Sequence, residues 1–319
     1  MTRRSSRRRS DRPGPSGFLV VDKPVGWTSH EVVDAARRWL GIRRVGHLGT
    51  LDPLATGLLP LAIREATKLA PFVAQGSRVY VGSIRLGVAT DTFDAEGRVL
   101  RRHDGPFPSE EAVAAALSDF VGETMQIPPM FSSVKKDGVP LYRLARRGEE
   151  VERAPRPIRI HSLEMHHYVP PEVGIEISCS SGTYVRTLAS DLGERLGCGA
   201  HLSGLRRISS GPFLMDHAVS VEELEAAAER GIYEKWLITP ERILGLPLVK
   251  LQVDQARRVG HGGDIPVAEA SGPFESGTPP RPGDRLAALA PSGKLLAVME
   301  LRPDRRLHPL RVLAAPERF

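Results

Sequence analysis

The segment from Gly46 to Leu59 is the strongest constraint on the fold, because it separates regular hydrophobic patterns and has no regular pattern itself. Before it, Phe18–Val21 form a short apolar run typical of a buried strand, and residues 32–40 are apolar at helical spacing. After it, residues 78–86 alternate as in a strand. Glycines and prolines within the segment disfavour a regular element, so we expect a loop. The order strand, helix, loop, strand predicts a fold that combines helices with a sheet.

Local signals also predict where two helices begin and end. Thr28 and Glu31 form a capping-box pattern at the start of the first helix, and Gly41 ends its apolar spacing. Further along the chain, alternation over residues 173–179 predicts a strand, and apolar residues at helical spacing predict a helix over residues 185–196. The chain therefore contains a second strand-to-helix unit.

Positive charge is concentrated at the N-terminus. Residues 1–12 contain six arginines and one acidic residue, which leaves nearly all of the formal net charge of +6 in this short stretch. Residues 1–16 are rich in Arg, Ser, Pro and Gly and are predicted to be a disordered basic tail. Any nucleic-acid surface on the nearly neutral remainder must come from local clusters, each of which is also typical of a solvated helix face. These clusters are Arg37/Arg38/Arg43/Arg44, Lys135/Lys136/Arg143/Arg146/Arg147 and Arg206/Arg207.

The sequence also bears on location and metal binding. It contains no apolar run long enough to span a membrane and no signal peptide, which predicts a cytoplasmic protein. Cys179 and Cys198 lie too far apart for a redox motif, so we expect them to be reduced packing residues. The acidic turn at residues 91–97 resembles a calcium loop, but Thr92 would occupy its first ligand position, so no metal site is predicted.

The pattern changes near residues 245–248, which predicts a domain boundary. Beyond it, short strand-like runs alternate with turns rich in glycine and proline, as in a small β barrel. The runs are residues 286–289, 294–301 and 310–313. Residues 268–283 are predicted to be a flexible loop within the barrel. Upstream, the mixed apolar and basic stretch at residues 126–136 is either a buried irregular strand or a mobile flap.

Alone, Asp52 and His47 do not identify a function, because Asp-Pro is a common turn opener and a single histidine is usually structural. The surrounding blocks are more specific. Residues 46–59 read GHLGTLDPLATGLL, and residues 21–29 read VDKPVGWTS. The later blocks, in chain order, are RLG at 85–87, QIPPM at 126–130, CSSGTYVRT at 179–187, DLG at 191–193, GCGAHL at 197–202 and LRR at 205–207.

These blocks, spread over residues 17–245, closely resemble the signature of the TruB-type tRNA pseudouridine synthases, bacterial enzymes that modify uridine 55 in the T-loop. The resemblance implies an α+β fold with a mixed-sheet catalytic domain at residues 17–245, including a flap at residues 124–152 that closes on the T-loop. It also implies a PUA-like RNA-binding β barrel at residues 246–319. The expected partner is the T-stem-loop of tRNA, bound without a guide RNA by a monomer that needs no cofactor.

The resemblance assigns roles to single residues. The catalytic group comprises Asp52, the active-site tyrosine Tyr80, and Arg186. The substrate-binding group comprises Lys23, which supports the site, Tyr184, Leu205 as an apolar wall, and His47, which enters the T-loop where the uridine has left. Tyr184 and Arg186 fall in the first turn of the helix predicted after residues 173–179, near its positive end.

The residue types suit the implied chemistry. Conversion of uridine to pseudouridine breaks the bond from N1 to C1′ and joins C5 to C1′, without oxidation or an imported group. An ionised carboxylate can act as nucleophile or stabilise a sugar cation, and Arg186 beside Asp52 would favour the charged form. The base must leave its stack, and Tyr80 and Leu205 would hold it while His47 fills the gap.

Several alternatives stay open at this point. Asp52 can attack ribose C1′ or uracil C6, and Tyr80 can act as a base or only stack, although a phenol with a pKa of about 10 is a poor base at neutral pH. A non-enzymatic RNA-binding protein would use the tail, flap and barrel without needing Asp52. A hydrolase of the nucleosidase type would cleave the same glycosidic bond. Substitution of Asp52 tests the first of these classes, and product analysis tests the second.

Overall fold

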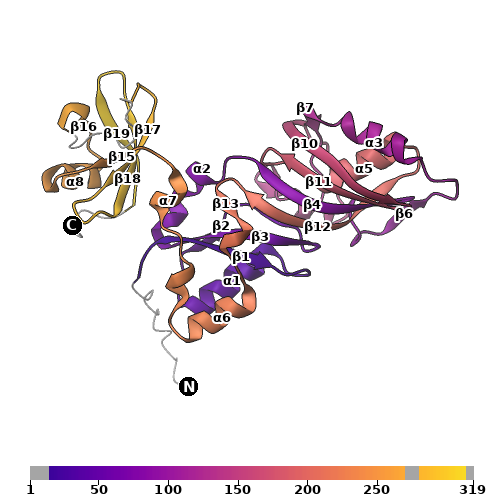
Figure 1. The fold of residues 1–319 in the computed structure, drawn as a ribbon, viewed down its shortest axis with the longest axis horizontal. Coiled ribbons are helices and arrows are strands. Elements are labelled where there is room, and N and C mark those ends of the chain that lie inside the picture. The colour runs from indigo at the N-terminus through magenta and orange to yellow at the C-terminus, as the bar shows by residue number, and fades with distance from the viewer. Residues whose placement is uncertain (1–13, 270–279, 314–319) are drawn as a thin grey trace.

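The structure, a computed structural model, describes residues 14–269 and 280–313. The predicted basic tail, apart from residues 14–16, and most of the predicted loop at residues 268–283 lie outside the described residues. The chain forms a ten-stranded sheet and a separate five-stranded sheet, which lie at opposite ends of the view in Figure 1. None of the helices in the described ranges is long and apolar enough to cross a membrane.

The larger sheet has the strand order β14-β1-β3-β12-β4-β11-β10-β7, with β2 paired to β3 and β13 paired to β12. The β1/β14 and β3/β12 pairs are parallel and the other pairs are antiparallel, so the sheet is mixed. This confirms the predicted α+β class. The strands are β1 (Gly17–Lys23), β2 (Val45–His47), β3 (Ala55–Ile63), β4 (Arg78–Leu86), β7 (Gly122–Gln126), β10 (Arg156–Val169), β11 (Glu172–Cys179), β12 (Ala200–Ser210), β13 (Phe213–Leu214) and β14 (Ala218–Ser220).

Both predicted helices are present. Helix α1 (Ser29–Leu40) begins at the capping box of Thr28 and Glu31, and ends at Gly41, which adopts a left-handed conformation with φ 66°. Helix α5 (Val185–Arg195) follows β11, as the second strand-to-helix pattern predicts. The sequence signals at helix ends were therefore reliable.

The predicted loop over residues 46–59 is wrong in part. Only residues 48–54 are irregular, whereas Ala55 to Ile63 form β3, which lies between β1 and β12. At Gly57, with φ 92°, an added Cβ would lie 2.3 Å from the carbonyl oxygen of Arg207, so the glycine permits close contact between β3 and β12. The glycine and proline residues that predicted a loop are thus part of a central strand.

Helices cover the larger sheet in two groups. Helix α1 packs against α6 (Val221–Glu229) beside β1, and α5 packs on β12 while α3 (Glu110–Ser118) packs on β10 (Figure 1). A small hairpin of β5 (Val88–Thr90) and β6 (Val99–Arg102) encloses the acidic turn at residues 91–98. The remaining helices are η1 (Arg64–Leu69), α2 (Ala70–Val73), η2 (Met215–His217), η3 (Tyr233–Trp236), α7 (Pro240–Leu244), α8 (Val253–Gly260) and η4 (Val267–Glu269).

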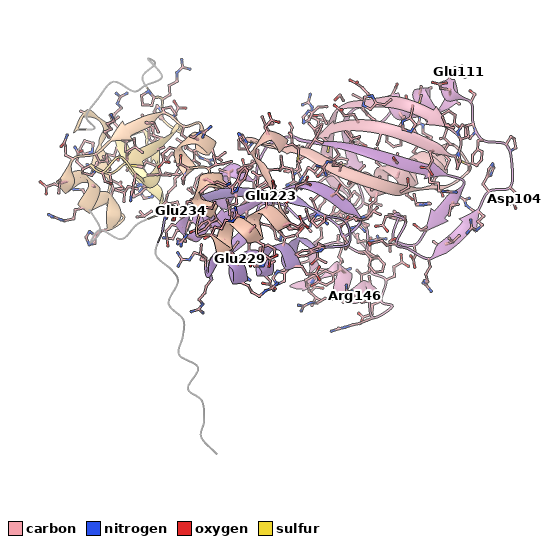
Figure 2. All side chains as sticks on the ribbon, turned by 60° about the horizontal axis from the view of Figure 1, so that its bottom comes forward. Asp104, Glu111, Arg146, Glu223, Glu229 and Glu234 are labelled. Atoms are coloured by element: carbon pink, nitrogen blue, oxygen red, sulfur yellow. The ribbon has the colours of Figure 1, made fainter. Side chains whose placement is uncertain are left out.

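Residues 127–155, named here the β7–β10 connection, leave the sheet after Gln126 and return at Arg156. They contain a two-stranded hairpin of β8 (Lys135–Lys136) and β9 (Val139–Pro140), followed by α4 (Leu141–Ala145). Arg146 projects from this excursion at the edge of the molecule (Figure 2). Of the two alternatives for residues 126–136, the buried strand is therefore wrong beyond the first residue.

The smaller sheet has the order β15-β17-β18-β19-β16 and forms a curled half barrel. Its strands are β15 (Leu248–Lys250), β16 (Ile265–Pro266), β17 (Arg285–Leu289), β18 (Leu295–Leu301) and β19 (Arg306–Val312), so the last predicted run begins earlier than expected. Leu289 and Val298 belong to the same apolar cluster as Phe18 and Val20 of β1. The two sheets are thus joined by a shared hydrophobic core.

Candidate active site

Asp52 lies in the irregular segment between β2 and β3, named here the Asp52 loop (residues 48–54). Its main-chain carbonyl accepts a hydrogen bond from the amide of Ala55 at 3.1 Å, at the start of β3. The side chain keeps 37% of its surface exposed. The carboxylate is therefore held by the sheet and still open to a substrate.

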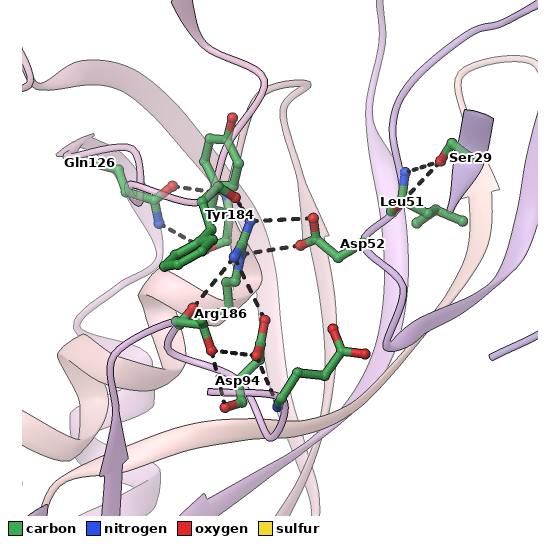
Figure 3. Close-up of polar contacts among 10 residues, drawn as sticks. Ser29, Leu51, Asp52, Asp94, Gln126, Tyr184 and Arg186 are labelled. Carbon is green, nitrogen blue, oxygen red and sulfur yellow. Dashed lines mark hydrogen bonds and ion pairs between the residues drawn. The ribbon is translucent and has the colours of Figure 1, made fainter. Parts of the chain in front are cut away.

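Arg186 reaches Asp52 from the first turn of α5, on the opposite side of the site (Figure 3). Its Nε lies 3.1 Å from Oδ2 of Asp52 and its Nη2 lies 3.3 Å from Oδ1, which is a side-on, two-point contact. The arginine side chain is only 4% exposed. The structure thus brings together two of the three residues assigned to catalysis.

Asp94 is a second carboxylate on the same arginine, and no sequence motif identifies it as a site residue. Its Oδ2 lies 3.6 Å from Nη1 of Arg186, and both side chains are buried. The Thr92 hydroxyl donates to Oδ1 of Asp94 at 2.6 Å and the Glu96 amide donates to the same atom at 3.1 Å. The acidic turn considered as a calcium loop therefore supplies a buried partner for Arg186, and the described residues contain no cluster suited to a metal.

The pKa of Asp52 reflects opposing influences. Burial raises the pKa above its usual value, and the charge of Asp94 adds to the rise. Arg186 and Lys23 lower it. The expectation that Arg186 favours the ionised form is correct for that pair, but it omitted the burial that raises the pKa overall.

Lys23 supports the Asp52 loop from β1. Its fully buried ammonium donates to the carbonyl oxygens of Pro24 at 2.9 Å, Trp27 at 2.5 Å and Pro53 at 3.3 Å. Burial lowers the pKa of Lys23 to about 8, although Asp52 opposes this shift. Because Pro53 follows Asp52 directly, this contact ties β1 to the Asp52 loop.

Tyr80 and Leu205 come from the neighbouring strands β4 and β12. Tyr80 is buried and Leu205 is half-buried, and Leu205 is paired with Gly82 across the two strands. Neither makes a hydrogen bond or ion pair with Asp52 in the described part of the chain. Tyr80 belongs to the apolar cluster that contains Leu51 and Val185, the residues before Asp52 and Arg186, and Leu205 packs against the same cluster, which suits an aromatic and apolar wall.

Arg206 and Arg207 do not form the basic surface cluster that the sequence suggested. Arg207 is fully buried, and it donates from Nε to the Leu58 carbonyl at 2.8 Å and from Nη2 to the Gly49 carbonyl at 3.1 Å. Arg206 forms a two-point ion pair with Asp22 at 3.0 and 2.7 Å. Alternation along β12 sends the two side chains to opposite faces, so the pair joins strands and does not form one surface patch.

His47 ends β2, immediately before the Asp52 loop. The side chain is half-buried, and its buried Nδ1 has no hydrogen-bond partner within the described residues. Burial lowers the pKa of the imidazole, and the nearby Arg207 and His30 lower it further. The ring is therefore held neutral, which suits stacking against a nucleobase more than pairing with a phosphate.

Tyr184 occupies the N-cap position of α5, and its ring lies beside the Arg186 guanidinium, 5.8 Å from centroid to Cζ. Burial raises the pKa of its hydroxyl, so the ring stays neutral. On the other side, Nη2 of Arg186 donates to the carbonyl of Phe131 at 2.5 Å. The β7–β10 connection therefore touches the charged centre through its main chain.

The mixed sheet, with the Asp52–Arg186 pair beside its strand β3, is compatible with the pseudouridine synthase class that the sequence motifs resemble. Comparison with known proteins agrees. The N-terminal domain of the TruB family of pseudouridylate synthases matches residues 37–185, and the tRNA pseudouridylate synthase B C-terminal domain matches residues 186–240. The chain belongs to the TruB family and is an enzyme.

Individual relatives cover most of the chain. The tRNA pseudouridine synthase B of Geobacter sulfurreducens is 46% identical over 285 residues, which cover 89% of this chain and 93% of that protein. The tRNA pseudouridine synthase B of Burkholderia mallei is 45% identical over 269 residues, with 84% and 86% covered. Among solved structures, a chain in the crystal structure of a Cbf5-Nop10-Gar1 complex aligns with a TM-score of 0.70 and 26% identity, over 94% of this chain and 86% of that one.

Proposed function

We propose that this enzyme converts uridine 55 in the T-loop of tRNA to pseudouridine, with Asp52 as the catalytic carboxylate. The two-point contact of Asp52 with Arg186, in a loop held by Lys23, is the observation that carries the proposal. The high identity to proteins named tRNA pseudouridine synthase B supports tRNA as the substrate.

In this proposal, Asp52 supplies negative charge at the sugar or the uracil ring while the glycosidic bond breaks. The raised pKa of the Asp52 carboxyl indicates that its anion is only partly stabilised. Such a carboxylate is a stronger nucleophile or base than one that is fully paired. Arg186 fixes the direction of both oxygens by its side-on contact.

The target nucleotide must be flipped out of the T-loop, because a stacked base cannot reach a carboxylate inside the protein. The sheet surface at Tyr80 and Leu205 suits the extruded uracil, with Tyr80 as the stacking platform. His47, neutral and on the adjoining strand end, fills the space that the base leaves in the RNA.

The chain organisation proposed with this function has a catalytic domain at residues 17–245 and a PUA-like RNA-binding domain at residues 246–319. The basic residues of the β7–β10 connection would contact the RNA backbone when the flap at residues 124–152 closes. We propose that the enzyme works in the cytoplasm as a monomer that reads the T-loop directly, without a guide RNA.

Asp52→Asn tests the proposal. This change keeps the size of the side chain and removes its charge, so single-turnover formation of pseudouridine on unmodified tRNA should fall at least about 1000-fold. Binding of tRNA, measured by filter retention, should stay within a few-fold because stacking and phosphate contacts do not need the carboxylate.

Product analysis of the wild-type reaction separates the remaining classes. A selective label for pseudouridine followed by mass spectrometry should place the product at position 55, with no free uracil released. Free uracil would indicate a hydrolase, and full activity of Asp52→Asn would refute the catalytic role of Asp52.

A further inference from the structure

Two buried polar side chains outside the predicted site hold the peptides next to Asp52 and Arg186 (Figure 3). The first is Ser29, in the first turn of α1, which is 2% exposed. Its hydroxyl donates to the carbonyl of Leu51 at 3.0 Å and accepts from the amide of Leu51 at 2.8 Å. One hydroxyl therefore pairs with both backbone groups of the residue that precedes Asp52.

The second side chain is Gln126, the last residue of β7, which is 6% exposed. Its Nε2 donates to the carbonyl of Tyr184 at 3.1 Å and its Oε1 accepts from the amide of Tyr184 at 2.8 Å. The side-chain amide thus replaces the peptide of a neighbouring strand. Tyr184 occupies the N-cap position of α5, so this contact fixes the start of the helix that carries Arg186.

Both backbone groups of Leu51 and the amide of Tyr184 depend on these side chains, whereas the carbonyl of Tyr184 also accepts from the amides of Thr187 at 3.1 Å and Leu188 at 3.2 Å. Leu51 is buried and lies in no helix or strand, and no other hydrogen bond to its backbone occurs among the described residues. A buried peptide without partners would rotate or draw in water. Rotation at Leu51 would redirect the side chain of Asp52, and movement at Tyr184 would shift Arg186.

We propose that Ser29 and Gln126 are positioning residues for the isomerisation, with Ser29 orienting Asp52 and Gln126 orienting Arg186 through the main chain. The inference rests on the proposed role of Asp52. A misplacement of about 1 Å in an active site can cost about 100-fold in rate, so loss of either contact should lower kcat by roughly 10- to 100-fold. The KM for tRNA should stay within about twofold, since both side chains are buried inside the protein.

Ser29→Ala tests the first contact, with Thr28→Ala as a matched control at the same helix end. The control removes the cap of α1 and should lower the melting temperature, but it leaves the Ser29–Leu51 contact intact. We expect the loss of kcat only in Ser29→Ala. Ser29→Cys keeps the side-chain size but hydrogen-bonds weakly, and should show the same loss if the alanine variant does not fold. A kcat equal to that of Thr28→Ala would overturn the role of Ser29.

Gln126→Glu tests the second contact through its pH dependence. The introduced carboxyl can accept from the Tyr184 amide, but it donates to the carbonyl only when protonated. Its charged neighbours are Arg156, opposite on β10, and Arg186 and Asp52 beyond Tyr184. The kcat of this variant relative to wild type should rise as the pH is lowered, whereas Thr124→Ala on the same strand should match wild type throughout. A relative kcat that does not change with pH would overturn the role of Gln126.

Asp52→Asn is assayed beside these variants to keep the two proposals apart. If it retains turnover, the proposed function fails. If it is inactive while Ser29→Ala and Gln126→Glu both turn over at the wild-type rate, the proposed function stands and the positioning inference fails alone.

Discussion

At the scale of single residues, the charged centre is one arginine shared by two carboxylates. Arg186 contacts both Asp52 and Asp94, and burial with the charge of Asp94 raises the pKa of Asp52. If the reaction needs ionised Asp52, its rate must fall on the acid side as this group takes up a proton. The midpoint of that fall should lie above the usual range for an aspartate.

Two substitutions should move this midpoint in opposite directions. Asp94→Asn removes a charge that raises the pKa of Asp52, so the acid limb should shift to lower pH. Arg186→Gln removes a charge that lowers the pKa, so the limb should shift to higher pH. Single-turnover rates across the acid range measure both midpoints, even though each variant is slower overall. A shift of both limbs in the same direction would contradict this account.

His47→Ala should slow the reaction by roughly 10-fold on intact tRNA, because the stacking that fills the vacated position in the RNA is lost. In a short stem-loop with a weakened T-loop, unstacking is already partly complete, so the same variant should lose much less. Rates on the two RNAs, each relative to wild type, provide the comparison. An equal loss on both would argue against a role in flipping.

The sequence motifs identified Asp52, Arg186 and Lys23 as candidate site residues, and the structure brings these three residues together as expected. Asp94 was missed because it lies in an acidic turn of ordinary composition. Only the pairing of that turn with Leu202 of β12 places its carboxylate on Arg186. Ser29 and Gln126 lie within these motifs, but their two-point contacts with backbone groups depend on tertiary structure and cannot be predicted from the motifs.

At the scale of elements, patterns with a clear period were predicted well and β3 was not. Propensity alone argues against a strand through Gly57 and Pro60, and the close approach of Arg207 that requires the glycine cannot be seen in a local pattern. The part of the fold that shapes the Asp52 loop was therefore the part that local rules described least well.

Gly57→Ala should destabilise the protein by about 3 kcal/mol or more, because the left-handed backbone and the Arg207 carbonyl both exclude a methyl group. Gly46→Ala is the control, since a Cβ there meets no atom within 4 Å. Urea unfolding of the two variants gives the comparison. Similar stability in both would show that β3 and β12 can separate without cost.

At the scale of the whole molecule, the five-stranded sheet is joined to the ten-stranded sheet by a shared hydrophobic core. Leu289 and Val298 share an apolar cluster with Phe18 and Val20, which are hundreds of residues away in sequence. The change of pattern near residues 245–248 gave no sign of this contact. Local sequence patterns locate elements, but they do not show which distant elements pack together.

Deletion of the chain from Leu248 should therefore have two effects. It should lower the melting temperature by exposing the shared cluster, and it should raise the KM for tRNA more than it lowers the saturated rate. Thermal unfolding by circular dichroism and steady-state kinetics measure the two effects. A truncated protein that is well folded but inactive at saturating tRNA would contradict this division of roles.

The strand order also sets when the active centre can form during synthesis. Strand β3 can pair with β1 and β2 early in synthesis, but its residues 55–57 pair with the much later β12. Arg207 of β12 donates to the carbonyl of Gly49 in the Asp52 loop and to that of Leu58 in β3. Contacts between such distant segments form late in folding. On the proposed role of Asp52, a nascent chain that ends before β12 lacks the contacts that hold the Asp52 loop, so we expect it to bind RNA without modifying it until most of its length has been translated.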